Sequence, residues 1–279
     1  MNVKLFSNKL RKGLFFVSQL IVLYLDFKPR LRIIFSNRNS SWKSRLQKGF
    51  RFTHHQIVFE EITAKNIANY DLIIPSTIKE LKNLNNTPEL IRHNLIPIPS
   101  LESIEICDDK KNFFQTLSKN GFGKYLPQTG GKYNYPYLLK KRNDEAGKNS
   151  YIISNEEQKH ALSEYINNPD YFSQELVSGK KEYATHILFK DNKVAYSITI
   201  KYNFEHQYQI HGKVQANYSE LIKSSPYLDV FTDILRSIKF EGLCCIDYKV
   251  IENSPIIFEI NPRSGISLCP FFFSILKVL

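Results

Sequence analysis

The stretch LCCIDYKVIENSPIIFEINP, from Leu243 to Pro262, decides how the C-terminal part of this chain is interpreted. Two apolar runs flank ENSP, which has the composition of a turn, so the stretch predicts a β-hairpin. If the hairpin is centred on Asn253, then Asp247 and Glu259 are equally far from the centre and lie directly opposite each other. Cross-strand partners are about 5 Å apart at Cβ, which is close enough for two carboxylates to share a divalent cation.

The apolar residues of the two runs predict the same register. Side chains alternate between the two faces of a strand, and a slip of one residue would mix apolar with polar side chains on each face. One face is expected to carry the apolar residues Ile246, Tyr248, Val250, Ile256, Phe258 and Ile260. The other face is expected to carry the polar residues Asp247, Lys249, Glu259, Asn261 and Arg263.

The polar face has two interpretations. Asp247, Glu259 and the side-chain carbonyl of Asn261 are hard oxygen donors, which suit Mg²⁺, and Arg263 could hold a phosphate or carboxylate with its bidentate guanidinium. Alternatively, the face is solvated and its acids are neutralised by Lys249 and Arg263. The hairpin taken by itself leaves both interpretations open.

Composition and charge narrow the class of protein. The chain has 279 residues, of which 42% are hydrophobic and 23% charged, as in ordinary globular proteins. Its net charge of +11 is concentrated at the N-terminus, because residues 1–50 hold eleven Lys or Arg and a single acid, Asp26. The four cysteines form no CxxC pair and no zinc-binding pattern, and adjacent Cys244 and Cys245 suit buried thiols in a reducing cytosol.

The N-terminal segment from Lys9 to Arg30 combines basic residues with an apolar run from Leu14 to Leu25. The run is shorter than the roughly 20 residues that span a bilayer, and no signal-peptide cleavage site follows it. We expect a buried helix that caps the first domain of a cytoplasmic protein. The alternative is weak peripheral contact with the inner membrane surface, whereas nucleic-acid binding is disfavoured because no recognition motif appears.

The first hundred residues predict a small parallel α/β unit. Strands are expected at Arg30–Ser36 and Tyr70–Thr77, with short helices at 44–50 and 62–69, and the two prolines of Leu95–Asp109 suggest a linker.

Further along the chain, a helix at Lys110–Asn120 and strands at Tyr135–Lys141 and Tyr171–Val177 are expected. Ser154 and Glu157 predict a capping box, and Asp191-Asn192 a hairpin turn.

In this order the motifs of residues 107–267 resemble those of the ATP-grasp superfamily, which includes D-alanine–D-alanine ligase and biotin carboxylase. DDKKNFFQTLSKNGFGKYLP resembles the helix that supplies a first phosphate-binding lysine, YPYLLKK the strand that supplies a second, and AGKNSYII the glycine-rich loop over the phosphates. SQELVSGKKEYATHILF is similar to the hinge strand and its Gly-x-x-Glu, and CIDYKV with FEINPR to the metal-binding end.

The resemblance implies roles for individual residues. ATP would be bound by Lys110, Lys140, Gly147, Glu175, Leu176, Val177 and Glu182, and one or two Mg²⁺ ions by Asp247, Glu259 and Asn261. Arg263 and Lys201 would act in catalysis, while His211 and Lys213 fall where acceptor-site residues often lie. The implied fold is α/β and α+β: a small N-terminal α/β domain at 1–105, a small ATP-grasp lobe at 106–178 and a large lobe at 179–279.

The implied activity is an ATP- and Mg²⁺-dependent carboxylate–amine ligase that acts on small molecules through an acyl phosphate. The sequence departs from the family in two places: the loop holds only Gly147, and the chain ends sixteen residues after Arg263, in the apolar CPFFFSILKVL. These departures motivate an alternative, a nucleotide-binding or scaffolding protein without catalysis. The apolar tail either packs in the core or provides the contact of a homo-oligomer.

Overall fold

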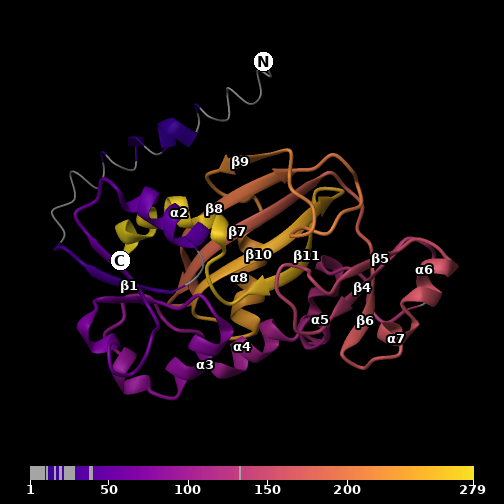
Figure 1. The fold of residues 1–279 in the computed structure, drawn as a ribbon, viewed down its shortest axis with the longest axis horizontal. Helices are drawn as coiled ribbons and strands as arrows, with labels where there is room; N and C mark the ends of the chain where they lie inside the picture. The colour runs from indigo at the N-terminus through magenta and orange to yellow at the C-terminus, as the bar shows by residue number, and fades with distance from the viewer. Residues whose placement is uncertain are drawn as a thin grey trace.

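The computed structural model describes residues 10, 12–15, 17–18, 21, 29–37, 40–131 and 133–279 (Figure 1). The strands within these residues form three sheets, and the fold is of the mixed α/β class that the sequence predicted. Most of the predicted N-terminal helix lies outside the described residues. Of its described side chains, Leu10, Leu14, Val17 and Ile21 are between 51% and 62% exposed, whereas a buried helix was expected.

None of the helices in the described ranges has both the length and the apolar character that crossing a bilayer requires.

The N-terminal sheet is parallel, with the order β2-β1-β3. Its strands are β1 (Arg32–Ser36), β2 (Gln56–Glu60) and β3 (Leu72–Ile74). Helices α2 (Ser40–Phe50) and α3 (Ile78–Asn85) accompany it, together with the short turns η1 (Ile67–Asn69) and η2 (Pro88–Ile91). The parallel unit was predicted, although β2 was missed and the second predicted helix is only the single turn η1.

The segment that was predicted as a linker ends in a helix. Residues 95–99 form neither helix nor strand, but α4 (Leu101–Asp108) follows because the hydroxyl of Ser100 accepts a hydrogen bond from the backbone N–H of Ser103. Helix α5 (Lys110–Leu117) begins after Asp109, whose carboxylate caps its first turn, and the turns η3 (Ser118–Phe122) and η4 (Gly123–Tyr125) complete this region.

The second sheet is antiparallel, with the order β5-β4-β6, and its strands are β4 (Tyr137–Lys141), β5 (Tyr151–Ile153) and β6 (Tyr171–Glu175). Helices α6 (Glu156–Ala161) and α7 (Ser163–Ile166) connect β5 to β6. The predicted capping box is wrong by one residue. Asn155 is the N-cap and accepts from the backbone N–H of Gln158, whose side chain in turn accepts from the backbone N–H of Ser154.

The third sheet is the largest and has the order β11-β10-β7-β8-β9. It consists of β7 (Lys181–Lys190), β8 (Lys193–Asn203), β9 (Tyr218–Ile222), β10 (Gly242–Ile251) and β11 (Ser254–Asn261), with α8 (Leu228–Ser237) packed on one face. The predicted hairpin turn is confirmed: Asp191 and Asn192 both have positive φ, as a two-residue turn between twisted strands requires.

The hairpin of β10 and β11 has the predicted register at the end that carries the two acids. Asp247 pairs with Glu259, but the pairing shifts by one residue beyond Asp247 because β11 contains a bulge at Phe258. Tyr248 therefore pairs with Ile257, which is fully buried in the core. The prediction that Ile256 and Phe258 share this apolar face is wrong, since Phe258 lines a cavity on the opposite face.

The apolar C-terminal segment η5 (Ile266–Val278) packs inside the chain. It lies against α2 (Figure 1), and one core cluster joins it to the N-terminal sheet and to β8. Phe272 contacts both Phe35 and Phe50, with ring centroids 5.0 and 6.2 Å apart. The structure thus favours core packing over a subunit contact, because these apolar side chains are already covered. All four cysteines are buried free thiols, which confirms the prediction for Cys244 and Cys245.

Candidate functional site

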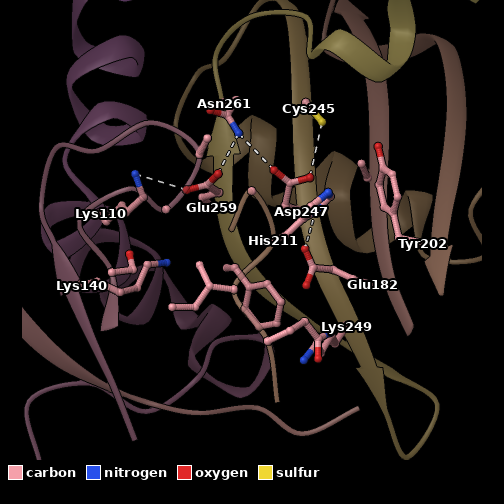
Figure 2. A pocket seen from close by; sticks show the side chains of 18 of the residues that line it. Lys110, Lys140, Glu182, Tyr202, His211, Cys245, Asp247, Lys249, Glu259 and Asn261 are labelled. Carbon is pink, nitrogen blue, oxygen red and sulfur yellow. Dashed lines mark hydrogen bonds and ion pairs between the residues drawn. The ribbon is translucent and has the colours of Figure 1, made fainter. Parts of the chain in front are cut away.

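A cavity of about 320 Å³ lies between the antiparallel sheet β5-β4-β6 and the five-stranded sheet. Most of the site residues predicted from the sequence line it, which brings together side chains from β4, β6, β7, β10 and β11. These are Lys110, Lys140, Gly147, Glu175, Leu176, Val177, Glu182, Asp247, Glu259, Asn261 and Arg263. Figure 2 labels six of them: Lys110, Lys140, Glu182, Asp247, Glu259 and Asn261.

Lys201 does not line this cavity. It is the direct cross-strand partner of Tyr183, and side chains at this register position face the core opposite the cavity. Its Nζ lies 3.4 Å from the carboxylate of Glu220, so it forms an ion pair on the other side of the sheet. The neighbouring residue Tyr202 lines the cavity instead.

Asp247, Glu259 and Asn261 form one polar group on the hairpin (Figure 2). The Nδ2 amide of Asn261 donates to Asp247 Oδ2 at 3.2 Å and to Glu259 Oε1 at 3.0 Å. Burial, together with the charge of Glu259, raises the pKa of Asp247. Burial has the same tendency at Glu259, but the nearby Lys110 and Lys140 outweigh it and lower that pKa. The raised pKa of Asp247 reflects the cost of a second buried negative charge beside Glu259, which a cation between the two strands would relieve.

The residues present fit Mg²⁺. Within the described part of the chain, no group of three His, Cys, Asp or Glu residues could hold a metal ion. The third donor here is an amide, and rotation of the Asn261 side chain about its last bond would present Oδ1 instead of Nδ2 to the same point. Two carboxylates and an amide oxygen are a typical partial ligand set for Mg²⁺, which completes its octahedron with water and phosphate oxygens.

Two buried lysines lie beside the carboxylates. Lys110 and Lys140 are each 7% exposed. Lys110 Nζ lies 3.3 Å from Glu259 Oε2 and donates to the backbone carbonyl of Asp144 at 2.7 Å. Burial lowers the pKa of Lys140 to about 8, against the opposing effect of Glu259. Buried cations of this kind are suited to bind a polyanion such as a triphosphate.

The end of β6 forms another wall of the cavity, where Glu175, Leu176 and Val177 follow one another. Lys249 Nζ donates to the carbonyl of Val177 at 2.8 Å and so ties this segment to β10. Gln174 is 1% exposed and lines the cavity, and its Oε1 is buried without a hydrogen-bond partner among the described residues. Gln174 was not among the residues predicted from the sequence, although a glutamine at a buried position of a strand was the available signal.

Glu182 and His211 form a close pair. Glu182 extends from β7 and is buried, and its Oε1 accepts a hydrogen bond from His211 Nδ1 at 2.7 Å (Figure 2). Burial of the imidazole opposes its charged form, but the bond to Glu182 and the charges of Glu182, Asp247 and Glu259 outweigh burial and raise the pKa of His211.

Two loops meet above the cavity: residues 144–150, between β4 and β5, and residues 208–214, between β8 and β9. Lys213 Nζ donates to the carbonyl of Ser150 at 2.6 Å. Gly212 and Gly147 have positive φ, and a Cβ at Gly212 would lie 2.2 Å from the carbonyl oxygen of Ala146. The loops are therefore in direct backbone contact. Arg263, which follows the end of β11, also reaches them, with one guanidinium nitrogen 3.3 Å from Glu145 Oε1.

A model of the ATP-grasp domain matches residues 107–267, which is more than half of the chain. The chain belongs to the ATP-grasp family. The match covers all the residues that line the cavity and both lysines, and it coincides with the range in which the sequence motifs were recognised. None of the curated proteins matches the chain in sequence.

Solved ATP-grasp structures share the fold at low sequence identity. D-alanine–D-alanine ligase from Bacillus anthracis, solved as a complex with ATP, is 15% identical with a TM-score of 0.57, covering 90% of this chain and 96% of its own. L-amino acid ligase from Bacillus licheniformis is 11% identical with a TM-score of 0.60, covering 88% and 70%. Biotin carboxylase from Campylobacter jejuni is 14% identical with a TM-score of 0.53, covering 95% and 68%.

Proposed function

We propose that this ATP-grasp protein is an ATP- and Mg²⁺-dependent carboxylate–amine ligase that forms an amide through an acyl phosphate. The observation that carries the proposal is the convergence, in one cavity, of two buried lysines with the oxygen donors of Asp247, Glu259 and Asn261. Cations and Mg²⁺ ligands placed side by side suit the transfer of a phosphoryl group. The names of the neighbouring structures, which include two amino acid ligases, support the same class of reaction.

ATP would lie along the cavity from the end of β6 to the hairpin. The adenine would contact the backbone of 175–177, and the unpaired Oε1 of Gln174 would accept a hydrogen bond from its exocyclic amine. Glu182 has a second carboxylate oxygen beside the one that His211 uses, and this oxygen is available to the ribose hydroxyls. Lys110 and Lys140 would contact the phosphates, with the 144–150 loop over them.

Asp247, Glu259 and Asn261 would hold one or two Mg²⁺ ions. When bound, Mg²⁺ supplies positive charge that reduces the repulsion between an attacking carboxylate and the phosphates of ATP. Lys110 and Lys140, which lie beside these ligands, would serve the same purpose. An oxygen of the substrate carboxylate attacks the γ-phosphorus, the bond to the β-phosphate oxygen breaks, and ADP leaves. Arg263, which lines this end of the cavity, would hold the carboxylate or the transferred phosphoryl group.

The product of this step is an acyl phosphate, whose carbonyl carbon carries a good leaving group. Attack by an amine nitrogen then forms the amide and releases inorganic phosphate. The acid and the amine are not specified by the residues described so far, because family membership fixes the fold and not the substrate.

Phosphate release with pooled carboxylates and amines, in the presence of ATP and Mg²⁺, tests the proposal. We expect release that requires both pools and that is lost in Asp247→Asn and Glu259→Gln, with the unfolding transition of each variant retained. If broad pools of acids and amines produce no phosphate, the ligase proposal is wrong.

A second candidate is a nucleotide-binding protein without catalysis. Two observations favour it: the single glycine in the 144–150 loop, and the ion pair of Glu145 with Arg263, which occupies the guanidinium proposed for the substrate. Thermal stabilisation by Mg²⁺-ATP, without turnover in any pool, would distinguish this candidate from the ligase.

A further inference from the structure

The geometry of the pair formed by Glu182 and His211 suits proton transfer as well as nucleotide binding. An ionised carboxylate can only accept hydrogen bonds, so the proton in the 2.7 Å bond is on Nδ1 of His211. In the uncharged ring the other nitrogen, Nε2, then carries the lone pair. Among the described residues, no hydrogen bond involves Nε2, while the ring itself lines the cavity. The carboxylate thus selects the tautomer whose basic nitrogen is available.

The ring of His211 is also held in place. Tyr202 near the end of β8 and Phe204 just after it contact the ring edge-on, with ring centroids 4.4 and 5.5 Å away. The next residue, Gly212, packs against the backbone of Ala146 in the 144–150 loop. The position of His211 is therefore fixed relative to the loop that would cover the phosphates. A base whose orientation is set by a carboxylate and by packing is the arrangement that efficient proton transfer requires.

The second half of the proposed reaction needs a base. An amine is mostly an ammonium ion at neutral pH, and an ammonium nitrogen has no lone pair with which to attack. Of the charged residues that line the cavity, Lys110, Lys140 and Arg263 are assigned above to the phosphates and the substrate carboxylate, and Lys249 is bonded to the carbonyl of Val177. Asp247 and Glu259 face the proposed Mg²⁺. Glu175 belongs to the wall proposed for the adenine. His211 is the remaining candidate among the described cavity residues, apart from Glu182, which is already bonded to it.

We propose, on the basis of the ligase function above, that His211 is the general base that deprotonates the amine substrate. Nε2 of His211 accepts a proton from the ammonium group and leaves a neutral amine. The nitrogen lone pair then forms the C–N bond with the acyl carbon, and the bond between that carbon and the phosphate oxygen breaks. The phosphate leaves with the electron pair and takes the second proton of the nitrogen, while His211 returns its own proton to solvent.

Two small amine acceptors of similar size distinguish a role of His211 as general base from a structural role. Methylamine is almost fully protonated at pH 7, whereas hydroxylamine is mostly neutral and needs no base before it attacks. Each is supplied with ATP, Mg²⁺ and a panel of acids comprising the proteinogenic amino acids, D-alanine and short aliphatic carboxylates. Turnover is measured as ADP release and product as amide or hydroxamate.

The test variant is His211→Asn, because an Asn amide can still donate to Glu182 and preserve the contact of the loop. We expect its turnover with methylamine, or with any protonated amine of the panel, to fall by about 100-fold or more, while hydroxamate formation stays within about threefold of wild type. The matched control, Lys213→Met, removes the bond to Ser150 from the same loop and should affect both acceptors equally.

Other outcomes contradict the proposal. If His211→Asn lowers turnover with both acceptors equally, the residue only positions the loop, and if it lowers neither, the residue has no role in the reaction. A wild-type protein that forms hydroxamates but accepts no protonated amine has no use for the base. A wild-type protein that forms no hydroxamate with any acid contradicts the ligase function itself, which is a different failure from the other three.

Discussion

The contact between the two loops above the cavity predicts a specific effect of Gly212→Ala. Gly212 has a φ of +100°, which L residues rarely adopt, and the new Cβ would lie 2.2 Å from the carbonyl oxygen of Ala146. Real contacts of this kind are longer by roughly 1 Å, so the loops must separate by about that distance. Backbone strain at such a φ costs on the order of 1–3 kcal/mol, and the collision adds about 1 kcal/mol or more.

The closed arrangement of the loops should therefore be destabilised by about 2–4 kcal/mol in Gly212→Ala. If ATP binds the closed arrangement, its apparent affinity falls by the same free energy, which is about 30- to 900-fold at 1.36 kcal/mol per factor of ten. Calorimetric titration with a non-hydrolysable ATP analogue and Mg²⁺ measures this directly. Urea unfolding of the same variant reports the strain in the absence of nucleotide.

Gly121→Ala is the matched control for backbone strain. Gly121 has a φ of +89°, but a Cβ at this residue would have no atom within 4 Å, so this variant tests strain without a collision. We expect a lower free energy of unfolding, by about 1–2 kcal/mol, with ATP affinity within about twofold of wild type. Wild-type ATP affinity in Gly212→Ala would refute the coupling between loop contact and nucleotide binding.

Three further predictions concern other parts of the molecule. Asp247→Asn should abolish phosphate release yet raise the unfolding midpoint in urea without ligand, because it removes a carboxyl whose ionisation is opposed by burial and by the charge of Glu259, which together raise its pKa; an unchanged or lower midpoint would contradict this. Lys140 is charged below its lowered pKa of about 8 and neutral above it, so ATP affinity should fall from pH 7 to pH 9.5. In the same titration, Lys140→Arg stays charged and should make ATP affinity nearly independent of pH over this range. Phe272→Ala should lower the free energy of unfolding by about 3–5 kcal/mol, whereas Val278→Ala, at a side chain 45% exposed, should change it by less than about 0.5 kcal/mol.

Period-two patterns explain what the sequence could predict. Asp247 and Glu259 were placed opposite each other because a hairpin that buries one face has few acceptable registers. The bulge at Phe258 could not be predicted in this way. It depends on the turn, where Glu252 and Asn253 both have positive φ and form a two-residue connection instead of one centred on a single residue. The bulge then restores the register just before the acids.

Contacts between distant segments explain what the sequence could not predict. Gln174 lies within the hinge-strand motif and His211 within the expected acceptor region, but the motif gave Gln174 no role of its own, and the contact of His211 with Glu182 forms only on folding. Lys201 shows the converse. Its position in the chain suggested the acceptor site, but strand alternation places Tyr202 towards the cavity and Lys201 away from it.

The packing of η5 has a consequence for the synthesis of this protein. Phe35 and Phe50, near the N-terminus, are covered by Phe272, which the ribosome adds more than 200 residues later. A nascent chain that has not yet reached residue 266 therefore presents the apolar face of its first sheet to solvent, even though the strands of that sheet are complete. Since exposed apolar surface and unpaired strand edges promote aggregation, this early segment is where a chaperone would be needed during translation.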